Sequence, residues 1–168
     1  FLAELVTTLN LTADEPIPDR CGKCTQCIDC CPTQAITSPH HLDARRCISY
    51  FTIEHKGSIP QEFREAIGDR IFGCDDCLEV CPWNRFAKAS TEAKFAAREY
   101  IDMSLNKFLT LSDENFRSLF SRSPVKRIGR DRFLRNVCIA LGNIGNICDI
   151  PCLERTIERE NQLVSEHA

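Results

Sequence analysis

The stretch CGKCTQCIDCCP, residues 21–32, says more about this protein than any other part of its sequence. Its spacing is C-x2-C-x2-C-x3-C-P, the run of bacterial two-cluster ferredoxins, and its four spaced cysteines are Cys21, Cys24, Cys27 and Cys31. Three thiolates at this spacing wrap around one [4Fe–4S] cubane and bind three of its irons, whereas the fourth cysteine of such a run ligates the other cluster. The run therefore predicts two neighbouring iron–sulfur clusters.

A second run, CDDCLEVCP at residues 74–82, repeats only the last three ligand positions of that pattern. The first position falls on Ile71, which cannot bind iron, and Cys47 lies between the two runs and can replace it. The ligand count then closes in a crossed arrangement, in which each run lends its last cysteine to the other cluster. Cluster I takes Cys21, Cys24, Cys27 and Cys81, and cluster II takes Cys74, Cys77, Cys47 and Cys31.

Twelve cysteines in 168 residues also leave two competing interpretations, disulfides and zinc. Disulfides need an oxidising compartment, and the sequence as given starts with no signal-peptide pattern. Zinc favours paired C-x2-C units, often with histidine, and leaves the two C-x3-C-P endings unexplained. We expect no ligand role for four cysteines: an inert neighbour at Cys30, and packed side chains at Cys138, Cys148 and Cys152.

The composition is typical of a water-soluble chain with a core of ordinary size. Hydrophobic residues make up 43% and charged residues 27%, and the net charge of -3 indicates no strongly acidic or basic partner for the whole molecule. No apolar stretch approaches the roughly 18 residues that a membrane span needs. We expect a cytoplasmic monomer with no membrane partner, and, because the first residue is Phe1 rather than Met, a fragment lacking its N-terminal part.

Helical patterns flank the cysteine-rich residues 21–86. Before and just after the cysteines, the sequence predicts the end of a helix in 1–16 and an Ala- and Lys-rich helical stretch in 87–110. Further helices are predicted to be capped by Ser112, to start at Ser123-Pro124, and to run from Asp131 to Leu141, with Gly142 and Gly145 at the end. Pro151 opens a last amphipathic helix that carries Leu153, Ile157 and Leu163. Two helices joined by a Gly-rich turn form a repeat unit. One such unit cannot bury both its faces, so we expect it to pack on the cysteine-rich part or on a neighbour.

The segment CISYFTIEHKG, residues 47–57, leads directly from a predicted ligand. Polar and apolar residues alternate from Tyr50 to Glu54, which predicts a half-buried strand. Its polar groups, with Ser49 at the start, either face solvent or touch a second cofactor. The same alternatives apply to the acidic pair 75–76 inside the second run, while Trp83 is expected to shield the clusters from water.

Positive charge is concentrated between residues 122 and 135. Six basic residues lie there against a single acid, Asp131, at a predicted helix start where backbone N–H groups also attract phosphate. Such a patch favours salt-dependent binding of nucleic acid; the competing interpretation is a solvated helix face with an Asp131–Arg135 pair. The basic residues are Arg122, Lys126, Arg127, Arg130, Arg132 and Arg135, and Lys56 is a further candidate.

Four segments together resemble the epoxyqueuosine reductase family, from about Pro18 to Asn146. They are CGKCTQCIDCCPTQAIT (21–37), LDARRCISYFTIEHKGSIP (42–60), GDRIFGCDDCLEVCPWNRF (68–86) and SPVKRIGRDRFLRNVCIALGN (123–143). That family performs the last step of queuosine synthesis at the tRNA wobble position, reducing an epoxide to an alkene with cobalamin and two [4Fe–4S] clusters. Cys30 departs from the family, in which we expect a small residue such as alanine.

The resemblance implies an α+β fold with three parts: 1–17 as the end of an upstream helix and a linker, 18–100 as a two-cluster ferredoxin-like domain, and 101–168 as a HEAT-like helical segment. It implies that the eight cysteines assigned by spacing bind the clusters. It further implies that Ser49, Cys74 and Asp75 line the cobalamin side. Contacts with the tRNA backbone are implied for Lys56, Arg127, Arg130 and Arg132.

The family's cobalamin domain and catalytic acid lie upstream of Phe1, so we expect no catalytic residue in this chain. The implied partners are the anticodon loop of a tRNA and an electron donor such as a flavodoxin or ferredoxin. Two alternatives stay open: a stand-alone two-cluster ferredoxin-type carrier, and a cobalamin and iron–sulfur enzyme like the reductive dehalogenases. The latter tend to carry a twin-arginine export signal and to lack a basic helical tail.

Overall fold

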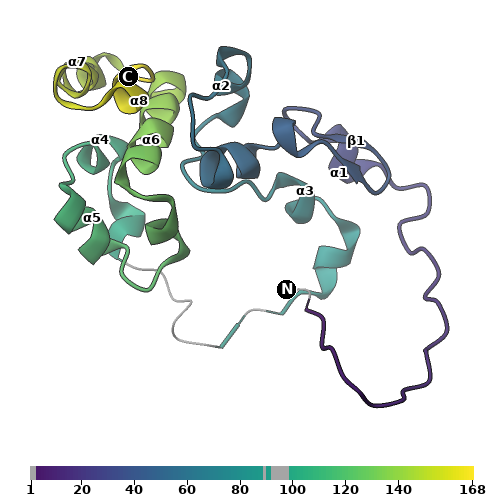
Figure 1. The fold of residues 1–168 in the computed structure, drawn as a ribbon. Coiled ribbons are helices and arrows are strands. Elements are labelled where there is room, and N and C mark those ends of the chain that lie inside the picture. Colours follow the sequence, from purple (N-terminus) through teal and green to yellow (C-terminus); the bar gives the residue numbers. More distant parts are fainter. Residues whose placement is uncertain (1–2, 89, 92–98) are drawn as a thin grey trace.

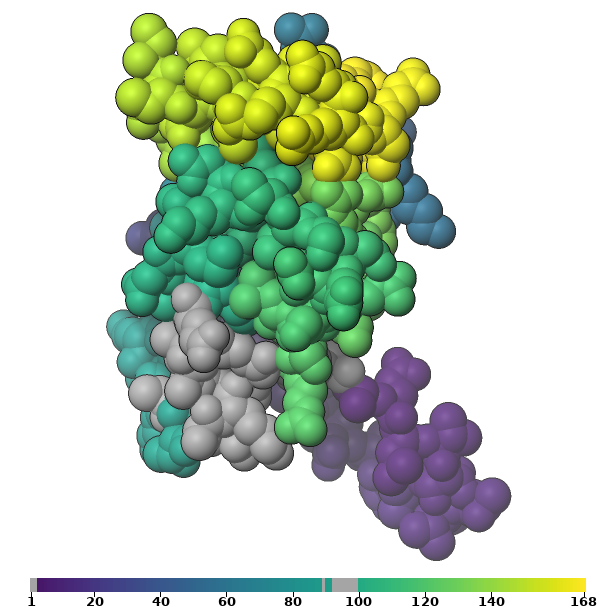
Figure 2. Space-filling view, turned by 90° about the vertical axis from the view of Figure 1, so that its left-hand side faces the viewer, coloured from purple at the N-terminus to yellow at the C-terminus, as the bar shows by residue number. Residues whose placement is uncertain are grey.

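The computed structural model describes residues 3–88, 90–91 and 99–168, and Figure 1 shows a mostly helical chain. Residues 3–20 form an exposed arm without helix or strand, and in Figure 2 the purple N-terminal residues stand apart from the green and yellow tail. Leu5 and Val6 are more than nine-tenths exposed. The predicted helix end in 1–16 is therefore wrong for the described residues, because nothing covers its apolar stripe.

The cysteine-rich residues form short elements. They are α1 (Gln26–Asp29), β1 (Ile36–Ser38), β2 (His41–Leu42), η1 (Ala44–Arg46), η2 (Tyr50–Glu54), α2 (Gln61–Ile67), α3 (Asp76–Glu79) and η3 (Pro82–Phe86). Strands β1 and β2 pair antiparallel, with Ile36 opposite Leu42, and form the one sheet of the described residues. Helices α1 and α3 are single turns that bury no residue, so hydrophobic packing does not explain their shape.

The tail consists of helices. They are η5 (Glu99–Asp102), α4 (Leu105–Phe108), α5 (Asp113–Leu119), η6 (Pro124–Ile128), α6 (Arg130–Ile144), η7 (Ile147–Asp149), α7 (Ile150–Arg159) and α8 (Gln162–Ser165). Two predicted starts are confirmed by hydroxyl caps: Ser112 accepts a hydrogen bond from the N–H of Asn115, and Ser123 accepts one from that of Val125.

Helix α6 lies in both hydrophobic cores. One face of α6 packs Phe133, Leu134 and Val137 into an aromatic cluster with side chains of α4 and α5. Its Ile139 joins a second core in the cysteine-rich part, whose members are Ile48, Phe51, Ile59 and Ile67. Full burial of each such side chain contributes about 1.5–3 kcal/mol, so α6 ties the tail to the cysteine-rich part.

Several boundaries differ from the sequence predictions. Helix α6 runs past the predicted end through Gly142 and ends at Gly145, and the last predicted helix is two helices, with Leu163 in α8. The predicted stretch 87–110 falls partly outside the described residues, at 89 and 92–98. The α+β prediction overstated the strands, since the described residues contain only β1 and β2.

The segment predicted as a half-buried strand is a π-helical turn, η2, with Phe51 and Thr52 buried. A short alternating run cannot by itself separate the two structures. Here the two strands of the described residues, β1 and β2, pair with each other, and the hydroxyl of Thr52 donates to the carbonyl of Ile48 at 2.9 Å. No helix among the described residues is long and apolar enough to cross a membrane.

Candidate iron–sulfur site

Four cysteines meet at a cavity of about 260 Å³. Two come from the turn that precedes α1, one lies in α1 and one ends the second run. The cysteines are Cys21, Cys24, Cys27 and Cys81, the set assigned to cluster I from the spacing. Pro82, Trp83, Arg20 and Arg85 complete the wall.

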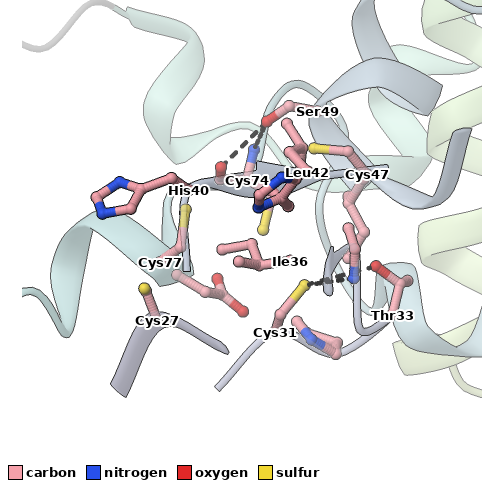
Figure 3. A pocket seen from close by; sticks show the side chains of 15 residues that line it. Cys27, Cys31, Thr33, Ile36, His40, Leu42, Cys47, Ser49, Cys74 and Cys77 are labelled. Atoms are coloured by element: carbon pink, nitrogen blue, oxygen red, sulfur yellow. Dashed lines mark hydrogen bonds between the residues drawn. The ribbon is translucent and has the colours of Figure 1, made fainter. Parts of the chain in front are cut away.

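A second cavity of about 420 Å³ lies beside the first, and Figure 3 shows the cysteines that point into it. Both runs contribute, and so do Cys47, Ile48 and Ser49, which directly precede η2. The cavity is lined by Cys31, Cys47, Cys74 and Cys77, the set assigned to cluster II, together with Cys27. Because Cys27 lines both cavities, the two sites adjoin.

The thiols repel one another electrostatically once ionised. Loss of hydration and then neighbouring negative charge raise the pKa of Cys21 and of Cys77 above the ordinary value. The charges that act on Cys21 are those of Asp19, Cys81, Cys27 and Cys24, and those that act on Cys77 are Cys30, Cys47 and Cys31. A cationic iron centre relieves this repulsion, since the thiolate is the metal ligand.

Cys31 is held differently from the other cysteines. Partial burial opposes ionisation, but the backbone N–H of Ala35, 3.2 Å from the sulfur, and the hydroxyl of Thr33 outweigh it and lower the pKa of Cys31. Hydrogen bonds to the charged form favour that form. These hydrogen bonds favour ionisation of the thiol at the position that crosses between the runs.

The donor set fits an iron–sulfur cluster better than the alternatives. All twelve cysteines are free, so no disulfide is formed. Four thiols around each cavity are the soft ligands that such clusters take. Asp19, Cys21 and His40 also bring ligand atoms within 4.8 Å of one another, but all three are exposed and Cys21 already lines the first cavity.

The three residues expected on the cobalamin side lie near one another at α3. Ser49 and Cys74 line the second cavity, while Asp75 is exposed at the start of α3. The hydroxyl of Ser49 accepts from the N–H of Cys74 at 2.9 Å and donates to its carbonyl at 3.1 Å (Figure 3). Ser49 is thus already engaged with the backbone of a predicted ligand.

Spacing did not indicate the salt bridge at this cavity. Asp76 lines the cavity and accepts two hydrogen bonds from Arg70 at 2.7 and 2.8 Å. The guanidinium of Arg70 holds the pKa of the Asp76 carboxyl below its ordinary value. Trp83, predicted as a shield, lines the first cavity but remains 48% exposed, with its ring 5.7 Å from that of Phe86.

Of the cysteines given no ligand role, Cys138 is buried as expected, and burial raises its pKa to about 12. Cys30 donates to the carbonyl of Cys27 and lines neither cavity. Cys152 is half-buried. Cys148 is exposed, so the prediction that its side chain is packed is wrong.

The predicted nucleic-acid residues gather at the start of α6. Lys56, Arg130 and Arg132 line one open cavity of about 420 Å³, although Asp113 and Asp131 line it too. The remaining candidate, Arg127, lies outside that lining and pairs with Glu54 at 2.7 Å.

Most of the basic side chains there already have partners within the chain. Arg130 pairs with Glu160 and donates to the carbonyl of Leu111, and Arg132 donates to the carbonyl of Ile128 at 2.6 Å. Lys56 is exposed. The predicted Asp131–Arg135 pair does not form: Asp131 lies 3.6 Å from Arg130, and Arg135 is fully buried.

Comparison with known proteins agrees with this geometry. Residues 20–84 match the family model of the 4Fe-4S double cluster binding domain. Over 99% of its length the chain is 47% identical to an epoxyqueuosine reductase of Xanthomonas campestris pv. campestris, of which it covers 48%. The chain thus spans about half the length of the curated relatives it matches.

Solved structures give the same result. An epoxyqueuosine reductase from Bacillus subtilis superposes with a TM-score of 0.85 at 33% identity, over 94% of this chain and 42% of that one. Another, solved with an epoxyqueuosine-modified tRNA-Tyr stem loop, superposes with a TM-score of 0.73 at 30% identity, over 93% of this chain and 50% of that one. Over nearly its whole length the chain is therefore similar to about half of an epoxyqueuosine reductase, in sequence and in fold.

Proposed function

We propose that this chain binds two [4Fe–4S] clusters through the crossed ligand scheme and passes electrons between them. The observation that carries the proposal is the grouping of the eight cysteines around two adjoining cavities, each lined by the four cysteines of one predicted set, with Cys27 also lining the second. The match of residues 20–84 to a double-cluster domain supports it independently. The ligands are Cys21, Cys24, Cys27 and Cys81 for cluster I and Cys74, Cys77, Cys47 and Cys31 for cluster II.

When bound, the clusters supply one-electron transfer. The residues of this chain bind and orient them. Thiolates hold the iron, the N–H of Ala35 stabilises negative charge on the sulfur of Cys31, and Pro82 and Trp83 cover one side of the first cavity. Hydrogen bonds to sulfur and exclusion of water are the means by which a protein adjusts a cluster potential.

We propose further that the chain is the electron-transfer part of a cobalamin-dependent enzyme that reduces epoxyqueuosine to queuosine in tRNA. Similarity over 99% of the chain to epoxyqueuosine reductases favours this function over a stand-alone carrier or a dehalogenase-like enzyme. A flavodoxin or ferredoxin is the proposed donor, and a tRNA substrate implies a cytoplasmic protein. The residues that carry out catalysis belong to the part of the family's length that this chain does not cover.

The cobalamin side is proposed at Ser49, Cys74 and Asp75. The position of Ser49 and Cys74 on the wall of the second cavity, with exposed Asp75 next in the chain, supports this assignment. It makes cluster II the cluster that faces the cobalamin.

The tRNA contacts are proposed at Lys56, Arg127, Arg130 and Arg132. The shared cavity at the start of α6 supports them, and exposed Lys56 is the residue best able to reach a phosphate. Arg130 and Arg132, whose guanidinium groups bind within the chain, contribute mainly by shaping this surface.

The proposed organisation is a linker in 1–17, a two-cluster ferredoxin-like domain in 18–100 and a HEAT-like segment in 101–168, in a monomer. The hydroxyl caps of the tail helices and the aromatic core, whose fully buried members all lie in 108–164, support the last division. The packing of Ile139 in the second core means that the two larger parts share a buried interface.

The ligand scheme is tested with full-length protein purified without oxygen. Wild type should contain about eight irons per chain, and Cys47→Ala and Cys81→Ala should each contain about four, because each removes a ligand from a different cluster. Cys148→Ala, which changes an exposed cysteine outside both cavities, is the matched control and should keep the wild-type iron content. A colourless protein containing zinc would contradict the proposal.

A further inference from the structure

The ligand that replaces Ile71 comes from a distant part of the chain, so something must hold Cys47 beside Cys74. Two hydroxyls on the segment after Cys47 do this. The hydroxyl of Ser49 accepts from the N–H of Cys74 at 2.9 Å, and that of Thr52 accepts from the N–H of Gly73, also at 2.9 Å. The consecutive N–H groups of Gly73 and Cys74, at the start of the second run, therefore donate to the segment that follows Cys47.

Thr52 is buried, and its hydroxyl both donates and accepts a hydrogen bond within the chain. It is 1% exposed, and its single hydroxyl proton is donated to the carbonyl of Ile48 at 2.9 Å. The oxygen is thereby oriented to accept from Gly73. The N–H of the half-buried Gly73 would lose its partner if the hydroxyl were removed, and this would release the chain at the start of the second run.

The tail joins the same two segments from another side. The amide of Asn136 on α6 donates to the carbonyl of Thr52 at 2.8 Å and to the carbonyl of Ile71 at 3.0 Å. Its oxygen accepts from the guanidinium of Arg135 at 3.0 and 3.1 Å, so every hydrogen-bonding atom of this amide is used. Asn136 is 1% exposed.

Arg135 fixes the amide and the π-helical turn together. Its guanidinium donates to the carbonyls of Phe51, His55 and Gly57 at 2.6–2.9 Å. Burial lowers the pKa of Arg135 to about 10, so the group remains charged near neutral pH. A fully buried cation is costly unless hydrogen bonds compensate it, and here those bonds are made to the segment that follows Cys47.

We propose that Asn136 and Thr52 are positioning residues for cluster II, which makes helix α6 of the tail part of the cluster site. The inference rests on the ligand scheme proposed above. The hydrogen bonds from these two residues set the spacing between the segments that carry Cys47 and Cys74. Three of the four cysteines of cluster I come from the first run, and the fourth, Cys81, lies at the end of the second run away from Gly73 and Cys74, so cluster I serves as an internal reference.

The test uses full-length protein purified without oxygen, with the potential and spectrum of each cluster followed by electron paramagnetic resonance during a redox titration. Thr52→Val keeps the shape and removes the hydroxyl. Its expected result is a shifted potential or a lost signal for cluster II alone, with iron falling from about eight towards about four per chain. Thr52→Ser should restore both values, and Asn136→Ala should act in the same direction as Thr52→Val.

Thr156→Val is the matched control, because Thr156 is a buried tail residue whose hydroxyl donates to the carbonyl of Cys152 at 2.9 Å. It should leave both clusters unchanged. Equal shifts of both clusters in Thr52→Val, or no shift of either, overturn the inference while the two-cluster assignment stands. Wild-type protein without two clusters contradicts the ligand scheme itself.

Discussion

The two cysteine runs and the helical tail owe their shapes to different forces. In the runs 21–32 and 74–82, the single-turn helices α1 and α3 bury no residue, and the cysteines are exposed or half-buried. In the tail, Phe116, Phe120 and Phe133 stack with ring centroids 5.0–5.5 Å apart and are almost fully buried. Exclusion of water stabilises the tail, whereas we expect bonds to iron to be the main stabilisation of the runs.

The segment between the runs, residues 33–73, packs against the tail. Its apolar residues share a core with Ile139 of α6, and Arg135 and Asn136 bind its carbonyls. We therefore expect this segment to keep its structure when the runs lose theirs.

Removing iron should have the largest effect and should separate the two regions. Oxidation followed by chelation should abolish hydrogen-exchange protection in the runs 21–32 and 74–82, because the bonds that shape them are gone. Peptides from α6 should keep their protection, since the aromatic core is intact. Loss of protection in α6 to the same extent would show that the two regions form one cooperative unit.

Shrinking the aromatic core should come next. Phe133→Ala should lower the free energy of unfolding by about 3–5 kcal/mol, because it leaves a cavity among packed rings. Urea denaturation followed by far-ultraviolet circular dichroism measures this, and the iron content before denaturation should stay at the wild-type level.

Phe86→Ala is the control for that variant, since Phe86 is 60% exposed beside the first cavity. It should change the free energy of unfolding by no more than about 0.5 kcal/mol. A loss as large as that of Phe133→Ala would mean that the cysteine runs carry a hydrophobic core of their own.

A third comparison divides the basic surface into a structural and a binding part. Arg130 is 16% exposed and Glu160 15% exposed, and Arg130 also donates to the carbonyl of Leu111. Arg130→Ala should therefore lower the free energy of unfolding by about 2 kcal/mol. Lys56→Ala should leave it within about 0.5 kcal/mol, since Lys56 is exposed.

Lys56→Ala, which should hardly change the free energy of unfolding, should instead weaken RNA binding. Fluorescence anisotropy with a tRNA-Tyr anticodon stem-loop at low salt should give weaker binding for Lys56→Ala and a shallower salt dependence, because one phosphate contact is lost. Unchanged affinity and salt dependence for this variant would remove Lys56 from the proposed tRNA surface.

The smallest effect is expected from His167 in the tail, whose ring the fold holds in the neutral form. Its Nδ1 donates to the carbonyl of Leu163 at 2.7 Å, and its Nε2 accepts from the N–H of Ile59 at 3.1 Å. Burial holds the pKa of His167 below its ordinary value. The charged groups that also act on it are Arg64, Arg135 and Glu166.

The sign of the pH dependence follows from this depressed pKa. The unfolded ring takes up a proton near its ordinary pKa of about 6.5, and the folded ring does so only at lower pH. The stabilisation is therefore complete above the pKa of the unfolded ring, and it is lost as the pH falls through the lower pKa of the folded ring. Urea titrations at about pH 8 and about pH 6 should show a smaller decline for His167→Gln than for wild type, and equal declines would exclude this role.

The spacing of the cysteines predicted how they group around the two cavities, except that Cys27 also lines the second, and it suggested Cys47 in place of Ile71. Such a grouping can be predicted because a ligand run is local: the number of residues between two thiols limits whether they can reach irons of the same cluster. The serine caps of the tail were predictable for the same reason, since a hydroxyl and the N–H it accepts from lie two or three residues apart.

Contacts between residues far apart in the chain could not be predicted in this way. The alternation in 50–54 suggested a strand, but Arg135 and Asn136, some eighty positions later, bind its carbonyls. The basic residues 122–135 read as a surface for nucleic acid, yet Arg135 is fully buried and Arg130 binds Glu160. Local spacing thus predicts which cysteines group together, while long-range packing determines what holds their segments in place, because those partners become neighbours only when α6 docks against the segment after Cys47.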